Sequence, residues 1–326
     1  MSRRGQFLAY RENTLMSKST SLTVRKEIVC KKSMRDKKLL LSITALLLLL
    51  TGCFSLEPFY FRNESVDKYF KTQDMAREKH YRGIIPQSLI KADSFVVEGD
   101  TIFAFWAMQP IDTLKQLDKT VTILYSHGNL RNINTYWDRV ELLWELGYRV
   151  YIYDYPGFGR SQGKPSSAAC FSSAKAALNR VYSNPNVDTA NVVFYGYSLG
   201  TYVATYLASE VRAPVVLTLE SAAASSSAFI EDSGLLDLPG GVISDDDFDN
   251  EKRIAHINCP LLMIHGKADA YVVFNHHVPR LWELAKEPKD SLWIENAGHG
   301  NIPYIAGNTY TKKIVNFITA HTSKKK

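Results

Sequence analysis

The sequence predicts an α/β fold in which a mostly parallel central sheet carries helices on both faces. Two observations support this prediction. Short apolar runs rich in β-branched and aromatic residues, as expected of buried strands, alternate with longer amphipathic or alanine-rich stretches, as expected of helices. Strands that are apolar throughout and separated by helices belong to parallel sheets buried on both faces.

The individual elements follow from these patterns and from the residues that end them. Residues 134–146 carry apolar and aromatic side chains at helical spacing and stop at Gly147, so they predict an amphipathic helix. Strands are expected at 90–97, 101–108, 121–125, 149–153, 191–195, 215–219, 261–264 and 291–294, the first two as a hairpin. Further helices are expected at 166–182, 201–210, 275–286 and 308–321. Residues 221–253 show no regular period.

The first 52 residues differ in composition from the rest of the chain. They contain 11 Lys and Arg but 3 Asp and Glu. Because the whole chain has a net charge of +6, the remainder carries a net charge of −2 and lacks the excess of basic residues that is typical of a nucleic-acid-binding protein. A basic segment at 34–38 precedes an apolar run at 39–50, which is short for a transmembrane helix but suits a signal peptide. We expect residues 1–52 to be a signal peptide with an artefactual extension, and Met34 to be the true start.

Cys53 follows this leader in the tetrapeptide Leu-Thr-Gly-Cys, which resembles a bacterial lipobox. The resemblance implies that Cys53 receives lipid and becomes the N-terminus of a mature protein held on a membrane of the cell envelope. Phe54 occupies the position where Asp retains lipoproteins at the inner membrane in enteric-type sorting, so the outer membrane is favoured. The alternative is an uncleaved anchor, with Cys53 an ordinary thiol.

Two segments follow the leader. Residues 53–87 are too aromatic for a free linker, and we expect a membrane tether that then packs against the domain formed by residues 88–323. Cys170 and Cys259 are expected to be separately buried thiols, although an exported domain could join them in a disulfide.

Ser198 stands at the centre of the sequence Gly-Tyr-Ser-Leu-Gly at 196–200, between an expected strand and an expected helix. Strand, G-x-S-x-G and helix make up the nucleophile elbow, a sharp turn that exposes the serine hydroxyl. Glycines on either side allow the strand and the helix to cross closely. The alternative is a glycine-rich turn that does no chemistry.

A serine nucleophile needs a base, and the base needs a carboxylate that fixes its tautomer. Ser198, Asp269 and His299 occur in the chain order Ser, Asp, His, and each follows an expected strand at its carboxyl end. Ligands bind at that edge of an open parallel sheet. Glu220 also ends a strand and is the alternative acid.

Five ordered motifs at the ends of successive strands resemble those of the α/β-hydrolase superfamily over roughly residues 90–321. They are His-Gly-Asn at 127–129, Asp-Tyr-Pro-Gly-Phe-Gly-Arg-Ser-Gln-Gly at 154–163, Gly-Tyr-Ser-Leu-Gly at 196–200, His-Gly-Lys-Ala-Asp at 265–269 and Gly-His at 298–299. The resemblance implies an oxyanion hole made by the backbone amides of Asn129 and Leu199. It also implies a short lid at 221–253, with open access to Ser198, and neither a cofactor nor a metal.

The remaining polar residues at strand ends are interpreted as structural. Asp154, His127 and His265 are expected to be hydrogen-bonded parts of the fold, and the Asn129 side chain a turn residue. His276 and His277 could suggest a metal site, but no carboxylate or Cys stands near them at ligand spacing in the sequence, so a helix surface is expected.

Together these features predict a membrane-anchored serine hydrolase that cleaves a carboxylic ester or thioester of a small or lipid-like substrate. Two alternatives stay open: a catalytically silent hydrolase fold that acts as an envelope binding or scaffold protein, and a serine peptidase or acyl-protein thioesterase. Motifs define the acyl-transfer mechanism, whereas lid and pocket shape define the substrate, and the sequence specifies no oligomeric state.

Overall fold

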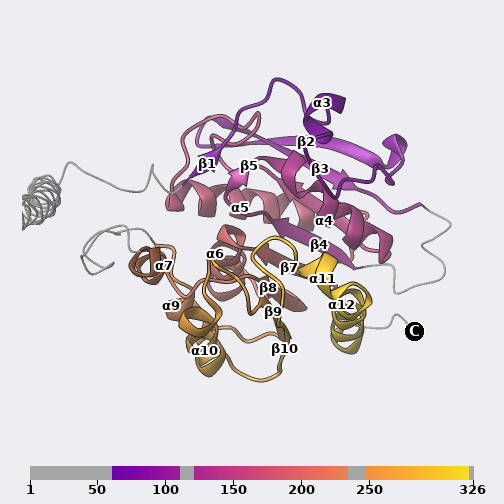
Figure 1. The fold of residues 1–326 in the computed structure, drawn as a ribbon. Coiled ribbons are helices and arrows are strands. Elements are labelled where there is room, and N and C mark those ends of the chain that lie inside the picture. The colour runs from indigo at the N-terminus through magenta and orange to yellow at the C-terminus, as the bar shows by residue number, and fades with distance from the viewer. Residues whose placement is uncertain (1–60, 111–120, 234–246, 323–326) are drawn as a thin grey trace, which may run out of the picture. The chain divides into compact units, whose positions relative to one another are not determined.

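An eight-stranded sheet forms the centre of the structure (Figure 1), a computed structural model that describes residues 61–110, 121–233 and 247–322. The strands lie in the order β10-β9-β8-β7-β4-β6-β3-β2. Six of them, from β10 to β6, are parallel, whereas β3 is antiparallel to both β6 and β2. Their bounds are β2 Ile90–Val97, β3 Asp100–Ala107, β4 Thr122–Ser126, β6 Arg149–Tyr153, β7 Val192–Tyr197, β8 Val216–Glu220, β9 Leu261–Gly266 and β10 Lys289–Ile294. The predicted mostly parallel sheet is confirmed.

Most helices connect parallel strands, although the first precedes β2 and the last two follow β10. The helices are α3 Thr72–Met75, α4 Ile133–Glu145, α5 Ser167–Tyr182, α6 Leu199–Tyr206, α7 Ser226–Ser233, α9 Asn250–Ile254, α10 Phe274–Leu284, α11 Ile302–Ala306 and α12 Asn308–His321. The N-termini of α4 and α5 are capped by the Asn132 and Ser166 side chains, which accept hydrogen bonds from the amides of Asn134 and Ala169. A 3₁₀ turn at Gln87–Leu89 precedes β2, and a two-stranded parallel pair joins β1 Arg62–Asn63 to β5 Leu130–Arg131.

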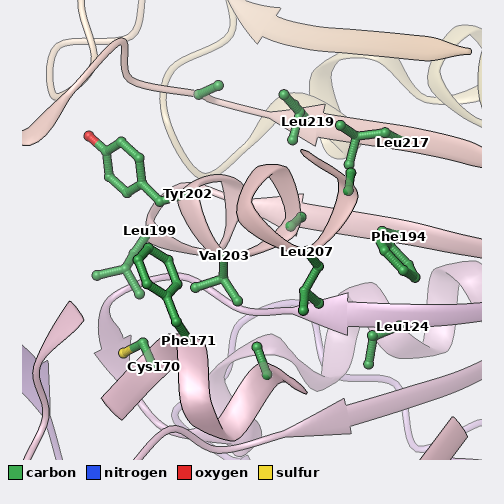
Figure 2. Close-up of a cluster of buried hydrophobic side chains, with 14 of the residues drawn as sticks. Leu124, Cys170, Phe171, Phe194, Leu199, Tyr202, Val203, Leu207, Leu217 and Leu219 are labelled. Atoms are coloured by element: carbon green, nitrogen blue, oxygen red, sulfur yellow. The ribbon is translucent and has the colours of Figure 1, made fainter. Parts of the chain in front are cut away.

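Successive residues of the central strands point to opposite faces of the sheet and build two hydrophobic cores. On β7, Phe194 belongs to the core shared with α5, α6 and α10, while Val193 and Tyr195 belong to the core shared with α4 and α12. Figure 2 shows the first of these cores, in which Leu199, Val203 and Leu207 follow one another along α6 and the π-helical turn Leu207–Val211 that continues it. Burial on both faces explains why the central strands β4, β7 and β9 are largely apolar.

The segment before β2 packs on the domain through aromatic side chains. Phe61 is buried edge-on against Phe158 and Phe248, and Tyr69 is buried with its hydroxyl donating to an Asp154 carboxylate oxygen. Residues 61–87 therefore lie against the domain. Met34, Cys53 and Phe54 lie outside the described residues.

The structure departs from the expected elements mainly in short helices. Residues 221–253 contain α7 and α9, whereas no regular structure was expected there, and α11 was not predicted either. Helices of five to eight residues have at most two turns, too few to show a period in the sequence. Residues 234–246, the middle of the expected lid, lie outside the described part of the chain.

Two further expectations concern the cysteines and the membrane. Cys170 and Cys259 are both buried and form no disulfide with each other, which confirms the separate thiols, and burial raises the pKa of the Cys259 thiol to about 12. In the described ranges, no helix has the length and apolar character needed to cross a membrane.

Candidate active site

Ser198 occupies a sharp turn between β7 and α6. Its backbone has φ 53° and ψ −119°, a conformation that is strained for a residue with a side chain. The turn depends on its glycines: a Cβ on Gly196 would lie 2.5 Å from the Gly200 carbonyl oxygen, and one on Gly200 would lie 1.9 Å from the Ser126 carbonyl oxygen. The sequence Gly-x-Ser-x-Gly is therefore a steric requirement of this strand-to-helix crossing.

His299 connects Ser198 to Asp269 through its two ring nitrogens. The distance from His299 Nε2 to Ser198 Oγ is 2.8 Å, and the distance from His299 Nδ1 to Asp269 Oδ2 is also 2.8 Å. Asp269 lies in the loop after β9, and His299 lies in the loop after β10. The structure thus brings together the three residues that the sequence singled out, at the carboxyl ends of three parallel strands of one sheet.

The Asp269 carboxylate is held ionised and correctly oriented. Its Oδ1 accepts hydrogen bonds from the amides of Tyr271 and Val272, both at 2.9 Å, which leaves Oδ2 for His299. Burial by itself would raise the pKa of Asp269, but the hydrogen bonds from His299 and from these amides outweigh it, and the pKa is lowered from its usual 3.8. A carboxylate can only accept here, so His299 carries its proton on Nδ1 and presents Nε2 as the acceptor for the Ser198 hydroxyl.

Asn129 and Leu199, the predicted oxyanion pair, lie on adjoining segments. Leu199 is the first residue of α6, where backbone amides have no partner within the helix. The close approach of Gly200 to the carbonyls of Ser126 and His127 brings the start of α6 against the loop that leads to Asn129. The Asn129 side chain accepts a hydrogen bond from the amide of Arg62 at 3.2 Å, so it has the structural role that was expected for it.

Glu220, the alternative acid, is fully buried and bound to other partners. It accepts hydrogen bonds from the hydroxyls of Tyr195 and Tyr310 at 2.5 and 2.7 Å, and it pairs with the Arg139 guanidinium at 3.2 Å. Both ring nitrogens of His299 are meanwhile engaged by Ser198 and Asp269. The structure therefore places Asp269, and not Glu220, against His299.

Asp154, His127 and His265 have structural contacts, as expected. Asp154 accepts from the Ile133 amide at the start of α4 and lies 3.1 Å from His127 Nε2. His265 Nε2 is 2.9 Å from the Val272 carbonyl oxygen, and burial lowers the pKa of this histidine. These residues hold the loops that surround Ser198.

The interpretation of His276 and His277 as a helix surface is wrong for one of the pair. His276 is exposed, but His277 is fully buried and its Nδ1 accepts a hydrogen bond from the Ala224 amide. The Asp232 carboxylate lies 2.9 Å from His276 and 3.0 Å from His277, so a carboxylate does stand near both. Asp232 belongs to α7, a helix that was not predicted, so this contact was not expected.

Three residues beside His299 were not anticipated. The Tyr271 side chain is 61% exposed, with its ring centroid 5.6 Å from that of His299. The Tyr197 hydroxyl donates to the His299 carbonyl oxygen, and Arg139 donates to the carbonyl oxygen of Gly300. Arg139 carried a signal in the sequence, because it is a charged residue on the apolar face of the predicted helix, three positions after Tyr136.

Comparison with known proteins also indicates a hydrolase fold for this chain. Residues 121–233 match the family model described as the alpha/beta hydrolase fold. The chain is 32% identical to the Uncharacterized protein YfhR of Escherichia coli (strain K12) over 201 residues, which cover 60% of this chain and 69% of that protein. It is 27% identical to the human Alpha/beta hydrolase domain-containing protein 17B over 61% of this chain and 66% of that one.

Solved structures show the same architecture. The Pyrococcus furiosus esterase Pf2001 superposes with a TM-score of 0.61 at 16% identity, over 81% of this chain and 99% of the esterase. The Pyrococcus horikoshii acylaminoacyl peptidase has a TM-score of 0.55 at 14% identity, over 73% of this chain and 42% of the peptidase. With the parallel sheet, the elbow and the relatives in agreement, the chain belongs to the α/β-hydrolase superfamily.

Proposed function

We propose that this protein is a serine hydrolase that cleaves carboxylic ester or thioester bonds through an acyl-enzyme. One observation carries the proposal: two hydrogen bonds of 2.8 Å link Asp269 to His299 and His299 to Ser198, with the serine held in the strained elbow conformation. In this arrangement His299 can take the proton of the Ser198 hydroxyl as the serine oxygen attacks. A serine without such a base is a poor nucleophile at neutral pH.

In the acylation step, Ser198 Oγ bonds to the acyl carbonyl carbon while its proton passes to His299 Nε2. The Asp269 carboxylate stabilises the imidazolium that results. The amides of Asn129 and Leu199 are proposed to face the oxygen that becomes negative, and such a donor is typically worth about 3 kcal/mol in the transition state. The tetrahedral intermediate then expels the alcohol or thiol, which takes the proton from His299, and leaves an ester on Ser198.

Deacylation repeats the same proton path with water. His299 Nε2 removes a proton from the water as its oxygen bonds to the acyl carbon. The bond to Ser198 Oγ then breaks, the serine recovers the proton, and the carboxylic acid leaves. His299 is partly exposed, with 19% of its side chain accessible, so water can reach it.

We also propose that the enzyme acts at a membrane of a bacterial cell envelope, held there by lipid on Cys53. This part rests on the lipobox-like tetrapeptide and the apolar run before it, and the outer membrane is favoured because Phe54 follows the cysteine. An enzyme held at a membrane meets lipid-like esters as well as small dissolved ones.

A fluorophosphonate probe tests the proposed chemistry, since it forms a covalent adduct with an activated serine. We expect labelling of the wild type and none of Ser198→Ala. Ser173→Ala is the matched control: this buried serine donates to the Cys170 carbonyl oxygen in α5, so its loss should leave labelling intact.

Hydrolysis of matched p-nitrophenyl esters and thioesters then separates the two bond types, and an N-acyl p-nitroanilide tests the peptidase alternative. A wild-type protein that is folded, takes no probe and hydrolyses none of these would contradict the proposal and favour the silent scaffold.

A further inference from the structure

Side chains from three other parts of the fold hold two consecutive carbonyl oxygens of the loop that carries His299. The Tyr197 hydroxyl donates to the His299 carbonyl oxygen at 3.0 Å, and Ser221 Oγ donates to the same oxygen at 3.3 Å. The Arg139 guanidinium donates to the next carbonyl oxygen, that of Gly300, at 3.0 Å. These three hydrogen bonds act on the loop backbone, and the Tyr197 ring in addition lies with its centroid 5.5 Å from that of the His299 ring.

This backbone needs external support. His299 lies between Gly298 and Gly300, and glycine restricts the chain less than any other residue. Of the loop's other contacts, the Gly298 amide donates to the Asn301 side chain at 2.8 Å, which is a local bond within the same loop. The ring of His299 must nevertheless be placed within hydrogen-bond distance of Ser198 and Asp269 at once, and small displacements of a catalytic group are costly.

The supporting residues are themselves firmly held. Tyr197 and Arg139 are each 6% exposed, and the guanidinium carbon lies 4.3 Å from the centroid of the Tyr197 ring. Ser221 is fully buried and has φ 55°, a second strained position beside the elbow. A strained backbone conformation of this kind persists only where many surrounding contacts hold it in place. Such residues are concentrated at functional sites.

Glu220 supports the His299 loop indirectly, through its ion pair with Arg139. A guanidinium buried without a counter-charge would be strongly unfavourable, and Glu220 supplies the nearer counter-charge at 3.2 Å, with Asp138 at 3.6 Å. The hydroxyls of Tyr195 and Tyr310 satisfy its other oxygen. The Glu220 backbone is also part of the site, because its carbonyl oxygen accepts from the Ser198 amide at 2.9 Å.

We propose that Tyr197, Ser221 and Arg139 are positioning residues, which fix the His299 loop relative to Ser198, and that Glu220 serves as the counter-ion of Arg139. The proposal rests on the proposed function, since it assigns His299 the role of base. It predicts that loss of the two hydroxyls lowers the rate of the chemical step without weakening substrate binding.

The test uses hydroxyl deletions in the full chain, because removal of Arg139 would leave Glu220 buried without its counter-charge. Tyr197→Phe, Ser221→Ala and the double variant are compared with Tyr310→Phe. The control loses an equally buried tyrosine hydroxyl from the same network, but one that bonds to Glu220 rather than to the His299 loop. Kinetics are measured well below each variant's Tm, so that all molecules are folded.

We expect kcat to fall roughly 3- to 30-fold in the single variants and by about 100-fold in the double variant, with KM unchanged. Tyr310→Phe should lower Tm but keep the wild-type kcat. Wild-type kcat in the double variant, or an equal loss in Tyr310→Phe, would overturn the proposal.

A second measurement does not depend on turnover. The proton that His299 Nδ1 shares with Asp269 should give a low-field proton NMR signal in the wild type and in Tyr310→Phe, and the double variant should broaden or shift it. If the wild type hydrolyses no substrate but this pattern appears, the proposed function fails while the positioning proposal stands. An unchanged signal in the double variant would contradict the positioning proposal.

Discussion

His299 Nε2 lies 2.8 Å from Ser198 Oγ, although 101 residues separate the two in the chain. The contact exists because β7 and β10 are parallel and end at the same edge of the sheet, with the elbow after one strand and the histidine loop after the other. Asp269 completes the arrangement from the end of β9, which lies next to β10.

The first prediction separates the two carboxylates. Asp269→Asn should lower kcat by about 10⁴-fold with little change in Tm, because the amide can donate a hydrogen bond to Nδ1 and so favours the wrong tautomer of His299. Glu220→Gln should have a much smaller effect on kcat. It should instead lower the free energy of unfolding by roughly 3 kcal/mol, because it removes the nearer of the two carboxylates that pair with the buried Arg139 guanidinium.

Steady-state kinetics and chemical denaturation of both variants provide the check. The reverse ranking, with Glu220→Gln inactive and Asp269→Asn active, would transfer the acid role to Glu220.

The second prediction concerns stability and pH. Burial lowers the pKa of His277 to about 4, from a usual value of 6.5. Between these values the unfolded chain binds a proton at this residue and the folded chain does not. The neutral, buried His277 therefore contributes its full share to the free energy of unfolding above pH 6.5. This contribution is lost as the pH falls towards 4, by up to about 1.4 kcal/mol per pH unit.

Urea denaturation at pH 7, 6 and 5 measures this slope. His277→Gln should flatten it, whereas His276→Gln, at the exposed neighbouring position, should leave it unchanged. Some slope will remain in both variants, because burial also lowers the pKa of His265. Equal slopes in His277→Gln and the wild type would show that His277 does not remain neutral.

The third prediction concerns membrane attachment. Cys53→Ser should yield an unprocessed precursor without lipid, because the serine hydroxyl cannot replace the thiol in lipid transfer. Metabolic labelling with a fatty-acid analogue, followed by gel electrophoresis, measures both mass and lipid. Cys259→Ser is a suitable control, since that thiol is buried in the domain. Equal label on Cys53→Ser and on the wild type would rule out Cys53 as the site.

The fourth prediction concerns acyl chain length. A site for a long chain needs a broad apolar cover, because affinity grows with the apolar area buried. In α7, Ala228 and Ile230 are already buried in the protein core, so they contribute little apolar surface to such a cover. Esters of about two to eight carbons should therefore have a higher kcat/KM than long-chain triglycerides.

A series of p-nitrophenyl esters and a dispersed triglyceride, assayed with the full chain in detergent micelles, measures this preference. A steady rise of kcat/KM out to sixteen carbons would show that the enzyme has a long-chain site, and would favour a lipase or a depalmitoylating thioesterase.

Much of the fold could be predicted because the patterns that indicate a strand or a long helix lie within one short stretch of the sequence. Apolar strands such as Arg149–Tyr153 and amphipathic helices such as α4 appear in the sequence within one or two residues of their observed bounds. Helices of five to eight residues could not be predicted, because they are stabilised by what they pack against. In α7 these contacts are made by Ala228 and Ile230, and in α9 by Ile254.

For the site, the sequence alone determined which residues stand at the ends of strands, and therefore that Ser198, Asp269 and His299 could meet. Only the tertiary structure decided between Asp269 and Glu220, because both follow a strand and both carry a carboxylate. Arg139, which is 81 residues before Glu220 in the chain, pairs with that residue in the core, while His299 lies against Asp269. A buried charge takes the partner that the fold brings within reach, and strand ends alone do not reveal which partner that is.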